Sequence, residues 1–323
     1  MARKIDWESQ IGRRLKLRDL HAFLTAVQRG SMSKAARQLG VSQPAVSDAI
    51  ADLEQALGVR LLDRRPQGIE PTMYGDALLR RSAAVFDELK QCIRDIEFLG
   101  DPTAGELRIG CPEGIAAILP PILESFARKY PRVVLHVDQV STATLELPGL
   151  RERKFDLVVA LLLMSRVDDS QADDLNVEVL FDDHLVIAAG MRSRWARRRK
   201  IDLSELIDEP WILAAPDTGP YRIVSEAFRA RGLSLPRISL MTLSVHLRTN
   251  MLASGHFIAT FPSSVARLHA DRFSLKVLPV DLPVRPWPVA IVTLKNRTLS
   301  PGVERFIAHI RDFTRPMRER LPG

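Results

Sequence analysis

The chain has 323 residues, of which 46% are apolar and 26% are charged, and it carries a formal net charge of +7. This length allows two or three compact units, each with its own core. No apolar segment is long enough to span a bilayer or to act as a signal peptide, and the two cysteines, Cys92 and Cys111, lie on different expected elements. We therefore exclude a membrane protein and a disulfide framework, and expect a cytoplasmic location with reduced thiols.

Near its start the chain is predicted to form two helices separated by a sharp break. Apolar side chains recur three and four residues apart from Leu20 to Val27, which indicates a helix with one buried face that ends at Gly30. Ser33 is expected to cap a short second helix over residues 34–39, because a serine hydroxyl accepts from the first unpaired amides of a helix.

A third helix is predicted over residues 43–57. Ser42 is its expected N-cap, Pro44 lies in its first turn, and Gly58 follows its end. The connection that begins at Gly40, where a left-handed residue is favoured, has the length of the turn in a DNA-binding helix-turn-helix pair. The face of this helix expected to pack inward comprises Val46, Ile50, Leu53 and Leu57.

This geometry assigns a DNA-reading role to the first turns of the third helix, which should enter the major groove. Gln43 and Ser47 lie four residues apart on one face, and a glutamine can bind adenine through two hydrogen bonds. Basic residues nearby, including Arg60, suit phosphate contacts, which position a protein without reading sequence. The predicted DNA-contacting residues are Ser33, Lys34, Arg37, Ser42, Gln43, Pro44, Ser47, Asp48, Arg64 and Arg65.

The excess of positive charge is concentrated in this region. Residues 1–81 contain 14 Lys and Arg against 9 Asp and Glu, so they have a net charge of +5, whereas the remaining 242 residues have only +2. Such a distribution is typical of a nucleic-acid reader with an appended sensor domain.

A long helix without Gly or Pro is predicted over residues 76–99, and one of its faces is apolar. The apolar positions are spaced 7, 4, 3, 4 and 3 residues apart, which forms an a/d heptad seam that must be buried. A helix from a second subunit would bury it, and a helix-turn-helix reader needs a dimer to engage two half-sites. The alternative is that the helix packs only on its own domain. The expected dimerisation residues are Leu78, Val85, Leu89, Cys92, Ile96 and Leu99.

Beyond a hinge of turn residues at 100–105, strands and helices alternate, which predicts parallel sheets with crossover helices. Strands are expected at 106–110, 133–140, 155–163, 185–189, 211–214, 257–261 and 288–294, and helices at 118–130, 221–231, 244–254 and 301–314.

Open parallel sheets bind ligands beyond the carboxyl ends of their strands, often against helix N-termini. Hydroxyl and amide groups there suit a carboxylate or a polyol, but Ser and Thr also cap helices and turns, so each residue alone has a structural alternative. Glu113 at a helix start disfavours an anion and favours a neutral or partly cationic effector or a sugar, whereas Arg222 and Arg248 could still hold an acid. The expected effector-binding residues are Pro112, Glu113, Gly114, Ser141, Thr142, Thr144, Pro216, Thr218, Gly219, Thr242, Ser244, Thr260 and Phe261.

Other reactive or charged groups have plainer interpretations. Cys111 could be a redox sensor, but its domain holds no second cysteine, and a core thiol is the interpretation we favour. The basic run at 194–200 is interpreted as a solvated loop rather than a second DNA contact. The histidines lack metal-ligand spacing, and the paired acids at 168–169, 173–174 and 182–183 are assigned to solvated turns. No phosphate-binding loop, H-E-x-x-H or G-x-S-x-G motif is present, so neither an enzyme nor a cofactor is expected.

A resemblance to LysR-type transcriptional regulators is carried by the run SMSKAARQLGVSQPAVSDAIADLEQALGVRLLDRRPQGIEPTMYG. Its A-A-x-x-L, S-Q-P-A-V-S and L-G-V-x-L-L-D-R segments are together specific, and the likeness covers nearly the whole chain. It implies an α/β fold class with a helix-rich winged helix-turn-helix domain and an effector domain of two α/β lobes, similar to type 2 periplasmic binding proteins. The implied domains are 15–75, the linker helix 76–99 and the effector domain 105–315, with lobe one at 105–180 and 282–315 and lobe two at 181–281.

Two features depart from the family pattern. Asp48 stands where a basic or polar residue is more usual; it could accept from a cytosine amino group, point away from DNA or orient an arginine. About sixteen residues precede the first helix, more than the family usually shows, and we expect most of them to be disordered.

The sequence and the resemblance together predict a non-enzymatic, sequence-specific transcriptional regulator that bends DNA in response to an effector held between its lobes. Expected partners are double-stranded DNA, a small-molecule effector, RNA polymerase and a second copy of the chain, with pairing of dimers into a tetramer implied by the resemblance. No metal, cofactor or membrane is expected. The alternatives are a ligand-independent architectural DNA-binding protein, which would not need so large an α/β domain, and an enzyme that processes small molecules.

Overall fold

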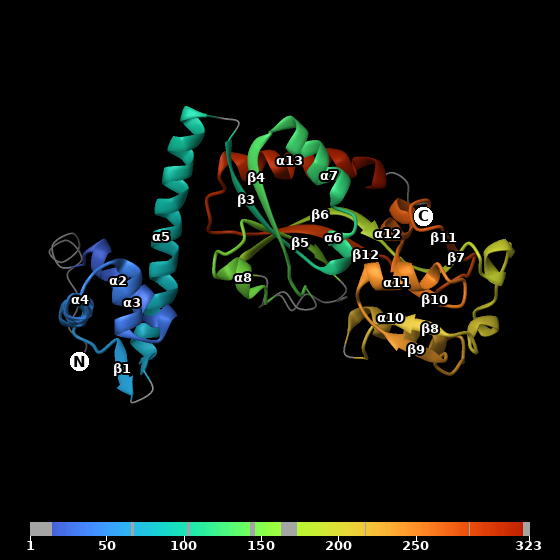
Figure 1. Ribbon diagram of the computed structural model, residues 1–323, viewed down its shortest axis with the longest axis horizontal. Coiled ribbons are helices and arrows are strands. Elements are labelled where there is room, and N and C mark those ends of the chain that lie inside the picture. The colour runs from blue at the N-terminus through green and yellow to red at the C-terminus, as the bar shows by residue number, and fades with distance from the viewer. Residues whose placement is uncertain are drawn as a thin grey trace. The chain divides into compact units, whose positions relative to one another are not determined.

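The computed structural model describes residues 15–65, 68–101, 104–142, 146–162, 173–216, 218–283 and 285–318. The chain divides into an N-terminal unit, Met1–Cys92, and a C-terminal unit, Ile93–Gly323 (Figure 1). The predicted disorder before the first helix concerns mainly residues 1–14, which lie outside the described residues. Within the described ranges, no helix has the length and apolar character that crossing a membrane requires.

The N-terminal unit is a helical domain with a two-stranded wing. Three glycines end its first three helices as predicted: Gly30, Gly40 and Gly58 have φ angles of 62°, 65° and 68°, in the left-handed region. The elements in chain order are α2 (Leu17–Arg29), α3 (Met32–Leu39), α4 (Gln43–Leu57), β1 (Leu62–Arg65), β2 (Gly68–Pro71) and the first part of α5 (Met73–Gly100).

A small apolar core holds these helices together. Phe23 of α2 and Leu53 of α4 are fully buried in it, and the inward face predicted for α4 does point into it. Glu54 fastens the wing to α4, because its Oε1 accepts from the backbone amides of Leu61 at 2.7 Å and Leu62 at 3.2 Å. The unit is therefore a winged helix-turn-helix.

The predicted cap of the second helix is wrong. Ser31 is the N-cap in place of Ser33: it has an extended backbone with φ −161°, and its hydroxyl accepts from the amide of Lys34. Gly30 ends the previous helix in the left-handed region, so the extended residue that a cap requires follows at once and the helix begins at Met32. Ser33 consequently lies inside α3.

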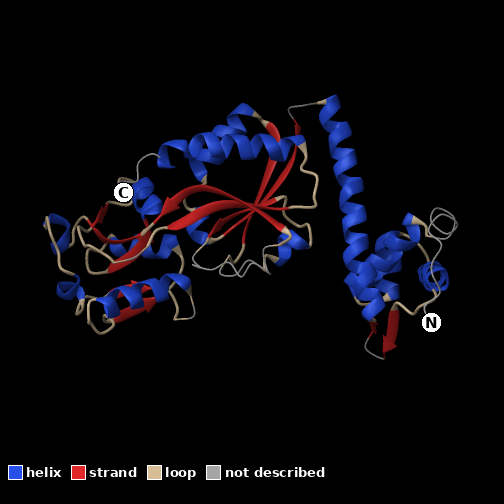
Figure 2. Cartoon of the chain, turned by 180° about the vertical axis from the view of Figure 1, so that it is seen from behind, coloured by secondary structure: helices blue, strands red, loops and turns tan. Residues whose placement is uncertain are grey.

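The C-terminal unit contains two five-stranded sheets flanked by helices (Figure 2). The first sheet and its helices form lobe one, and the strand order is β4-β3-β5-β12-β6. Its strands are β3 (Ala104–Cys111), β4 (Arg132–Gln139), β5 (Leu157–Leu161), β6 (Leu175–Asp183) and β12 (Trp287–Leu294), and its helices are α6 (Glu113–Ala116), α7 (Pro120–Lys129), α8 (Pro148–Arg151) and α13 (Pro301–Arg318).

The second sheet and its helices form lobe two, with the strand order β11-β7-β10-β8-β9. The chain enters lobe two after β6 and returns to lobe one at β12, so two segments connect the lobes, as expected. The strands are β7 (Leu185–Gly190), β8 (Trp211–Leu213), β9 (Ile238–Met241), β10 (Ile258–Pro262) and β11 (Leu275–Val277), and the helices are η1 (Arg194–Arg197), η2 (Leu203–Leu206), α10 (Gly219–Ala230), α11 (Val245–Leu252) and α12 (Ser263–His269).

The expectation of parallel sheets is only partly right, because both sheets are mixed. Strand β3 pairs in parallel with β4 and β5, and β8 pairs in parallel with β9 and β10. Strand β12 is antiparallel to β5 and β6, and β7 is antiparallel to β10 and β11. The strands β6, β7 and β12 adjoin the crossings between lobes. None of them is therefore joined to its neighbour in the sheet by the long crossover connection that a parallel pair of consecutive strands requires.

One pair of acids predicted in a solvated turn, 182–183, lies instead at the end of strand β6. Asp183 is buried, and its carboxylate accepts from the hydroxyl of Ser263 at 2.7 Å and from the amide of Ser264 at 3.2 Å. A carboxylate at this place stabilises the start of α12. Of the other predicted acid pairs, 173–174 lies in a turn and 168–169 falls outside the described residues.

Helices cover both faces of the sheet in lobe one. Helices α7 and α13 lie over one face, where the rings of Phe126 and Phe306 meet edge to face with their centroids 5.1 Å apart (Figure 1). Helix α8 covers the other face, where Leu150 packs against Val158 and Val292. The main apolar core continues from lobe one into lobe two, so the junction between the lobes is packed.

Candidate nucleic-acid interface and small-molecule site

The first turn of α4 is exposed, as a helix that reads base edges must be. Gln43 and Asp48 are exposed on it, and Ser47 is half-buried. The Ser33 hydroxyl, from α3, donates to Gln43 Oε1 at 2.7 Å. This hydrogen bond orients the amide and directs its N–H groups away from α3, where they can donate to a ligand.

The other predicted DNA-contacting residues lie on α3, at the start of α4 and on the wing. Ser42 caps α4, because its hydroxyl accepts from the amide of Ala45 at 3.3 Å. The wing contributes Arg64 and Arg65, which belong to β1 and whose side chains lie outside the described parts of the chain. The exposed members of the predicted set are Ser33, Lys34, Arg37, Ser42, Gln43, Pro44 and Asp48.

The apolar seam of α5 is exposed along most of its length. Leu89 is 40% exposed, Ile96 64% and Leu99 82%, and the thiol of Cys92 is also exposed. Leu78 differs from the others, because it packs against the core of the N-terminal unit. A single chain thus leaves a stripe of large apolar side chains in water, which is costly unless a partner covers it.

Glu113 is the predicted site residue with the most informative contacts. It is the first residue of α6 in lobe one, and its Oε1 accepts from the backbone amide of Val245, the first residue of α11 in lobe two, at 3.0 Å. Its Oε2 accepts from the side-chain amide of Gln139, at the end of β4. The carboxylate therefore lies at the junction of the lobes, held from both sides.

Arg248, in the second turn of α11, is buried beside this junction and is only 6% exposed. Its Nη1 donates to the carbonyl oxygen of Thr260 at 2.5 Å and its Nη2 to that of Leu243 at 3.0 Å, while the guanidinium lies 4.7 Å from the ring centroid of Phe261. Burial lowers the pKa of Arg248 to about 10, and the charge of Glu113 opposes this change. The guanidinium therefore remains positive at neutral pH.

Several predicted hydroxyl residues act as caps. Thr218 and Ser244 are the N-caps of α10 and α11, and Thr242 Oγ1 accepts from the amide of Ser244 at 3.1 Å. The buried hydroxyl of Thr142 donates to the carbonyl oxygen of Leu161 at 3.5 Å. These bonds favour the structural alternative for these residues. Of the rest, Pro112 and Gly114 are half-buried beside Glu113, Thr260, Phe261 and Gly219 are buried, Ser141 and Pro216 are exposed, and Thr144 falls outside the described residues.

The structure brings part of the predicted effector set together. Glu113, Ser244, Thr260 and Phe261 gather around Arg248, whereas no hydrogen bond among the described residues links the loop at 216–219 to that group. A pocket of about 210 Å³ lies beside the Glu113–Val245 contact, with lining residues from both lobes that include His246, Thr249 and His269.

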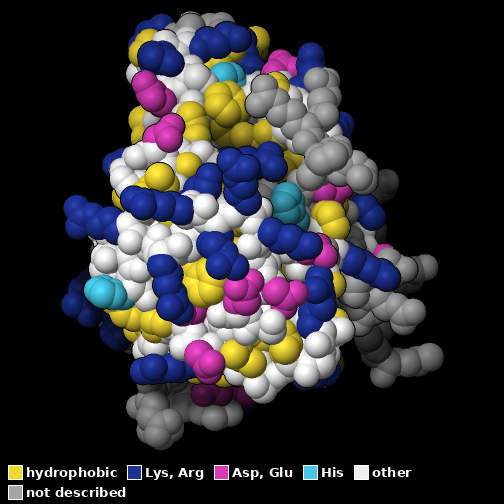
Figure 3. Space-filling model, turned by 90° about the vertical axis from the view of Figure 1, so that its right-hand side faces the viewer, with side chains coloured by type: hydrophobic (Ala, Val, Ile, Leu, Met, Phe, Trp, Pro, Cys, Tyr) yellow, Lys and Arg dark blue, Asp and Glu magenta, His cyan; other side chains and the backbone are white. Residues whose placement is uncertain are grey.

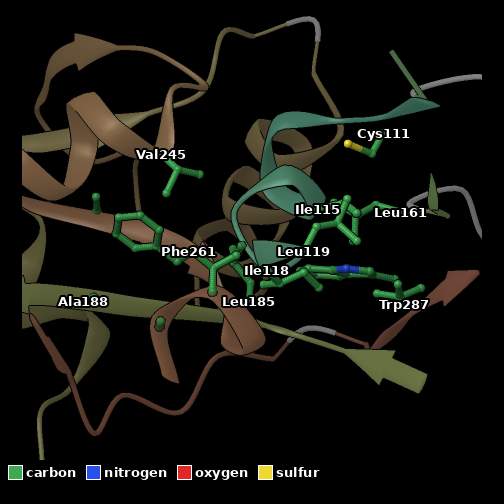
Figure 4. Packing of buried hydrophobic residues seen from close by; sticks show 14 of the residues in the cluster. Cys111, Ile115, Ile118, Leu119, Leu161, Leu185, Ala188, Val245, Phe261 and Trp287 are labelled. Atoms are coloured by element: carbon green, nitrogen blue, oxygen red, sulfur yellow. The ribbon is translucent and has the colours of Figure 1, made fainter. Parts of the chain in front are cut away.

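The floor of this junction is apolar. One apolar cluster spans the junction. Figure 4 shows Val245 and Phe261 of lobe two at one side of it, Ile115, Leu161 and Trp287 at the other, and Leu119 and Leu185 between them. The main apolar core crosses the junction, so the two lobes pack against each other there.

Cys111, at the end of β3, is fully buried, and this supports its interpretation as a core thiol. Burial raises the pKa of Cys111 to about 11, and the nearby carboxylates of Glu113 and Asp138 contribute to this rise. The thiolate, which is the reactive form, is therefore scarce at neutral pH.

The basic run at 194–200, predicted to be a solvated loop, begins with the short helix η1 and buries Trp195, while its Lys and Arg residues are exposed. Figure 3 shows Lys and Arg side chains spread over the end of the unit that carries it. Arg194 and Arg198 lie over the ring of Trp195, 5.0 Å and 5.9 Å from its centroid, and Arg197 and Lys200 are exposed. Among the described residues, no group of His, Cys, Asp or Glu has the arrangement of a metal site.

The contacts of two residues at the junction, Gln139 and Arg248, were not predicted from the sequence. Gln139 was assigned only to a strand, and nothing in its local pattern marks it as a partner of Glu113. Arg248 was predicted only as a possible anion ligand. It follows Val245 by three residues on a predicted helix, so the two side chains lie on the same helix face, and this spacing indicates that Arg248 is buried.

Comparisons with known proteins agree over most of the chain. A model described as "Bacterial regulatory helix-turn-helix protein, lysR family" matches residues 17–76, and one described as "LysR substrate binding domain" matches residues 100–315. The transcriptional regulator GbpR of Azospirillum brasilense is 28% identical over 305 residues, covering 92% of this chain and 86% of the relative. The regulator TdcA of Escherichia coli K12 is 27% identical over 301 residues, covering 93% of each.

Solved structures show the same fold. A full-length variant of OxyR from Pseudomonas aeruginosa superposes with a TM-score of 0.64 at 23% identity, covering 93% of this chain and 95% of that one. Full-length CbnR in complex with its target DNA superposes with a TM-score of 0.50 at 21% identity, covering 93% and 100%. With a helix-turn-helix domain followed by a substrate-binding domain, the chain belongs to the LysR family of transcriptional regulators.

Proposed function

We propose that this chain binds promoter DNA through the first turns of α4. When a small molecule binds where the two lobes meet, the way in which the chain binds and bends that DNA changes. The observation that carries the proposal is the exposed Gln43 amide, oriented by Ser33 at the end of the helix that would enter the major groove. The match of residues 17–76 to the helix-turn-helix model of the lysR family supports DNA binding by the N-terminal unit, and full-length CbnR, which has the same fold, was solved in complex with its target DNA.

The functional parts would be the reader at 15–75, the linker helix at 76–99 and the sensor at 105–315. We infer that two copies pair through the exposed seam of α5, so that two readers engage two half-sites. Pairing of sensors into a tetramer is supported by the edge strands β4 and β9, where Val134 and Met241 are exposed. Contact with RNA polymerase would then depend on where the bound DNA is bent.

The effector needs to contribute only a small free energy of preferential binding. Bending a site of this size costs a few kcal/mol, so a small change in the angle between two readers can alter binding appreciably. An effector that prefers one quaternary state tenfold contributes about 1.4 kcal/mol per site. A ligand at the lobe junction needs only this difference in affinity to shift regulation.

The reading role of Gln43 is testable on the full-length protein. Gln43→Ala should weaken binding to the operator roughly tenfold or more, because a two-bond contact to a base contributes about 1–3 kcal/mol of discrimination. Binding to unrelated DNA should not change. The measurement is gel retardation of a fragment from upstream of the chain's own gene, against a scrambled fragment of equal length.

Lys34→Ala is the matched control, because Lys34 is exposed on α3 and is assigned to phosphate. It should weaken specific and non-specific binding alike and lower the salt dependence by about one counterion. If Gln43→Ala instead weakened both fragments equally, Gln43 would have no reading role.

The sensor role is tested by thermal unfolding of the full chain with sugars, amines and small carboxylic acids at millimolar concentration. At least one compound should raise the melting temperature by mass action and change the DNase footprint. If no compound did so, the result would favour the alternative of a ligand-independent architectural DNA-binding protein.

A further inference from the structure

The first turn of α11 has the properties of an anion-binding site. Helix α11 begins in lobe two with Ser244 as its N-cap, whose hydroxyl accepts from the amide of Leu247 at 3.2 Å. The amide of Val245 therefore has no partner within the helix and points outward, and the helix dipole adds positive potential there.

A buried cation lies in the same helix. Arg248 is only 6% exposed, its guanidinium is held by two carbonyl oxygens, and its Nε has no hydrogen-bond acceptor among the described residues. Within the described residues it also forms no ion pair with a carboxylate. A guanidinium buried in this way requires a nearby negative charge to offset its desolvation.

The negative charge that reaches this place comes from the other lobe. Glu113 Oε1 accepts from the Val245 amide at 3.0 Å, and the charge of Glu113 acts on Arg248 through space. Gln139 of lobe one holds the second carboxylate oxygen. Glu113 is thus placed as a bound carboxylate ligand would be, although it belongs to the protein itself.

We propose that the first turn of α11 and Arg248 form an anion site that the chain fills with its own Glu113. Two consequences follow for the function proposed above, on which this inference rests. The site excludes effectors that would place a carboxylate at α11, so the effector presents hydrogen-bond donors to this part of the junction, as an amine or a polyol does. Glu113 also fastens lobe one to lobe two in the absence of effector.

The test empties the site and offers it a free carboxylate. In the full-length protein, Glu113→Ala should lower the melting temperature, and potassium acetate should then raise it saturably, by about 3 °C at concentrations well above the dissociation constant. Potassium chloride at equal ionic strength serves as the reference. The wild-type protein, whose site is filled, should show no difference between the two salts.

Three further variants test whether acetate binds at the place of the Glu113 carboxylate: two controls and a second variant that empties the site. Glu113→Gln keeps a side-chain oxygen against the Val245 amide, so it should not respond to acetate even though its charge is gone. Glu106→Ala removes an exposed carboxylate of β3 in the same lobe and should also show no response. Glu113→Ser is prepared in parallel with the alanine variant as a second way to empty the site.

A saturable response to acetate confined to Glu113→Ala and Glu113→Ser supports the proposal. The absence of any response in these variants, or an equal response in wild type and in Glu106→Ala, overturns it. The melting temperature in these salts involves neither DNA nor effector, so failure of the regulator proposal is recognised separately, by the gel-retardation and ligand-screening experiments above.

Discussion

A full-length variant with Leu89→Asp and Ile96→Asp is expected to be monomeric and to bind its operator roughly 10²–10⁴-fold more weakly than the wild type. The two side chains are 40% and 64% exposed and lie on the same face of α5, together with Val85 and Leu99. A carboxylate at each position would leave two charges unsolvated in a paired seam. The loss in affinity is the advantage that two linked readers have over one.

Sedimentation velocity over a range of concentrations measures the assembly state, and gel retardation measures the affinity. Lys90→Asp is the control, because Lys90 lies on α5 between the seam positions and is exposed. It introduces the same charge without altering the seam, so dimers should persist. Dimers in the double variant would show that α5 does not provide the interface, and the chain would then have to pair elsewhere.

The parts of the fold that sequence predicts well are those decided by neighbouring residues. The three glycines that end α2, α3 and α4 are positioned where only a residue tolerant of positive φ fits, and the bounds of α4 follow from Ser42 and Gly58. Apolar periodicity likewise finds most helices and buried strands. The error at Ser33 arises because two serines are separated by one residue, and only the position of the preceding turn decides which one caps.

Contacts between distant residues were not predictable in this way. Strand β6 was missed, because its exposed positions and terminal acids resemble a loop until Asp183 is seen to cap α12, eighty residues later. The mixed direction of the sheets depends on how the strands beside the two crossings pair with their neighbours, which the alternation of strands and helices in the sequence does not reveal.

In the candidate site, too, features decided by neighbouring residues were predicted and contacts between distant residues were not. The charge of Glu113 predicts that it disfavours an anion, and this stays a prediction. Its position after a strand and at the start of a helix was predicted. Its partner was not, because the Val245 amide lies 132 residues away and carries no side-chain signal. Thr218 and Ser244 serve as caps, which is what the local pattern of a serine or threonine before a helix most directly indicates, and their contact with an effector stays a prediction.

Removing the carboxylate of Asp156 is expected to destabilise the C-terminal unit by about 3–5 kcal/mol. Asp156 precedes β5 in lobe one; its Oδ1 accepts from Arg297 at 2.9 Å and from Arg94 of α5 at 3.2 Å, and its Oδ2 accepts from the amide of Arg108 at 2.9 Å. The side chains of Asp156 and Arg297 are 2% and 1% exposed. Asp156→Ala therefore leaves a guanidinium buried without its counter-charge, and the melting temperature should fall by roughly 10 °C.

A double-mutant cycle, measured by thermal and urea unfolding, tests whether the unpaired charge of Arg297 causes the loss of stability. Arg297→Met alone should be destabilising, but Asp156→Leu with Arg297→Met should cost less than the sum of the two single changes, because no unpaired charge remains. The amide of Arg108 still loses its acceptor, so stability should not return fully to the wild-type value.

Arg94→Ala tests whether the end of α5 depends on this carboxylate for its attachment to lobe one. Arg94 makes one bond of 3.2 Å to Asp156 and is 22% exposed, so its loss should cost no more than about 1 kcal/mol. A cost equal to that of Asp156→Ala would mean that the ion pair with α5, rather than the buried pair with Arg297, stabilises this lobe. Additive effects in the cycle would show that the buried charges do not depend on each other, and the explanation for the large loss would be wrong.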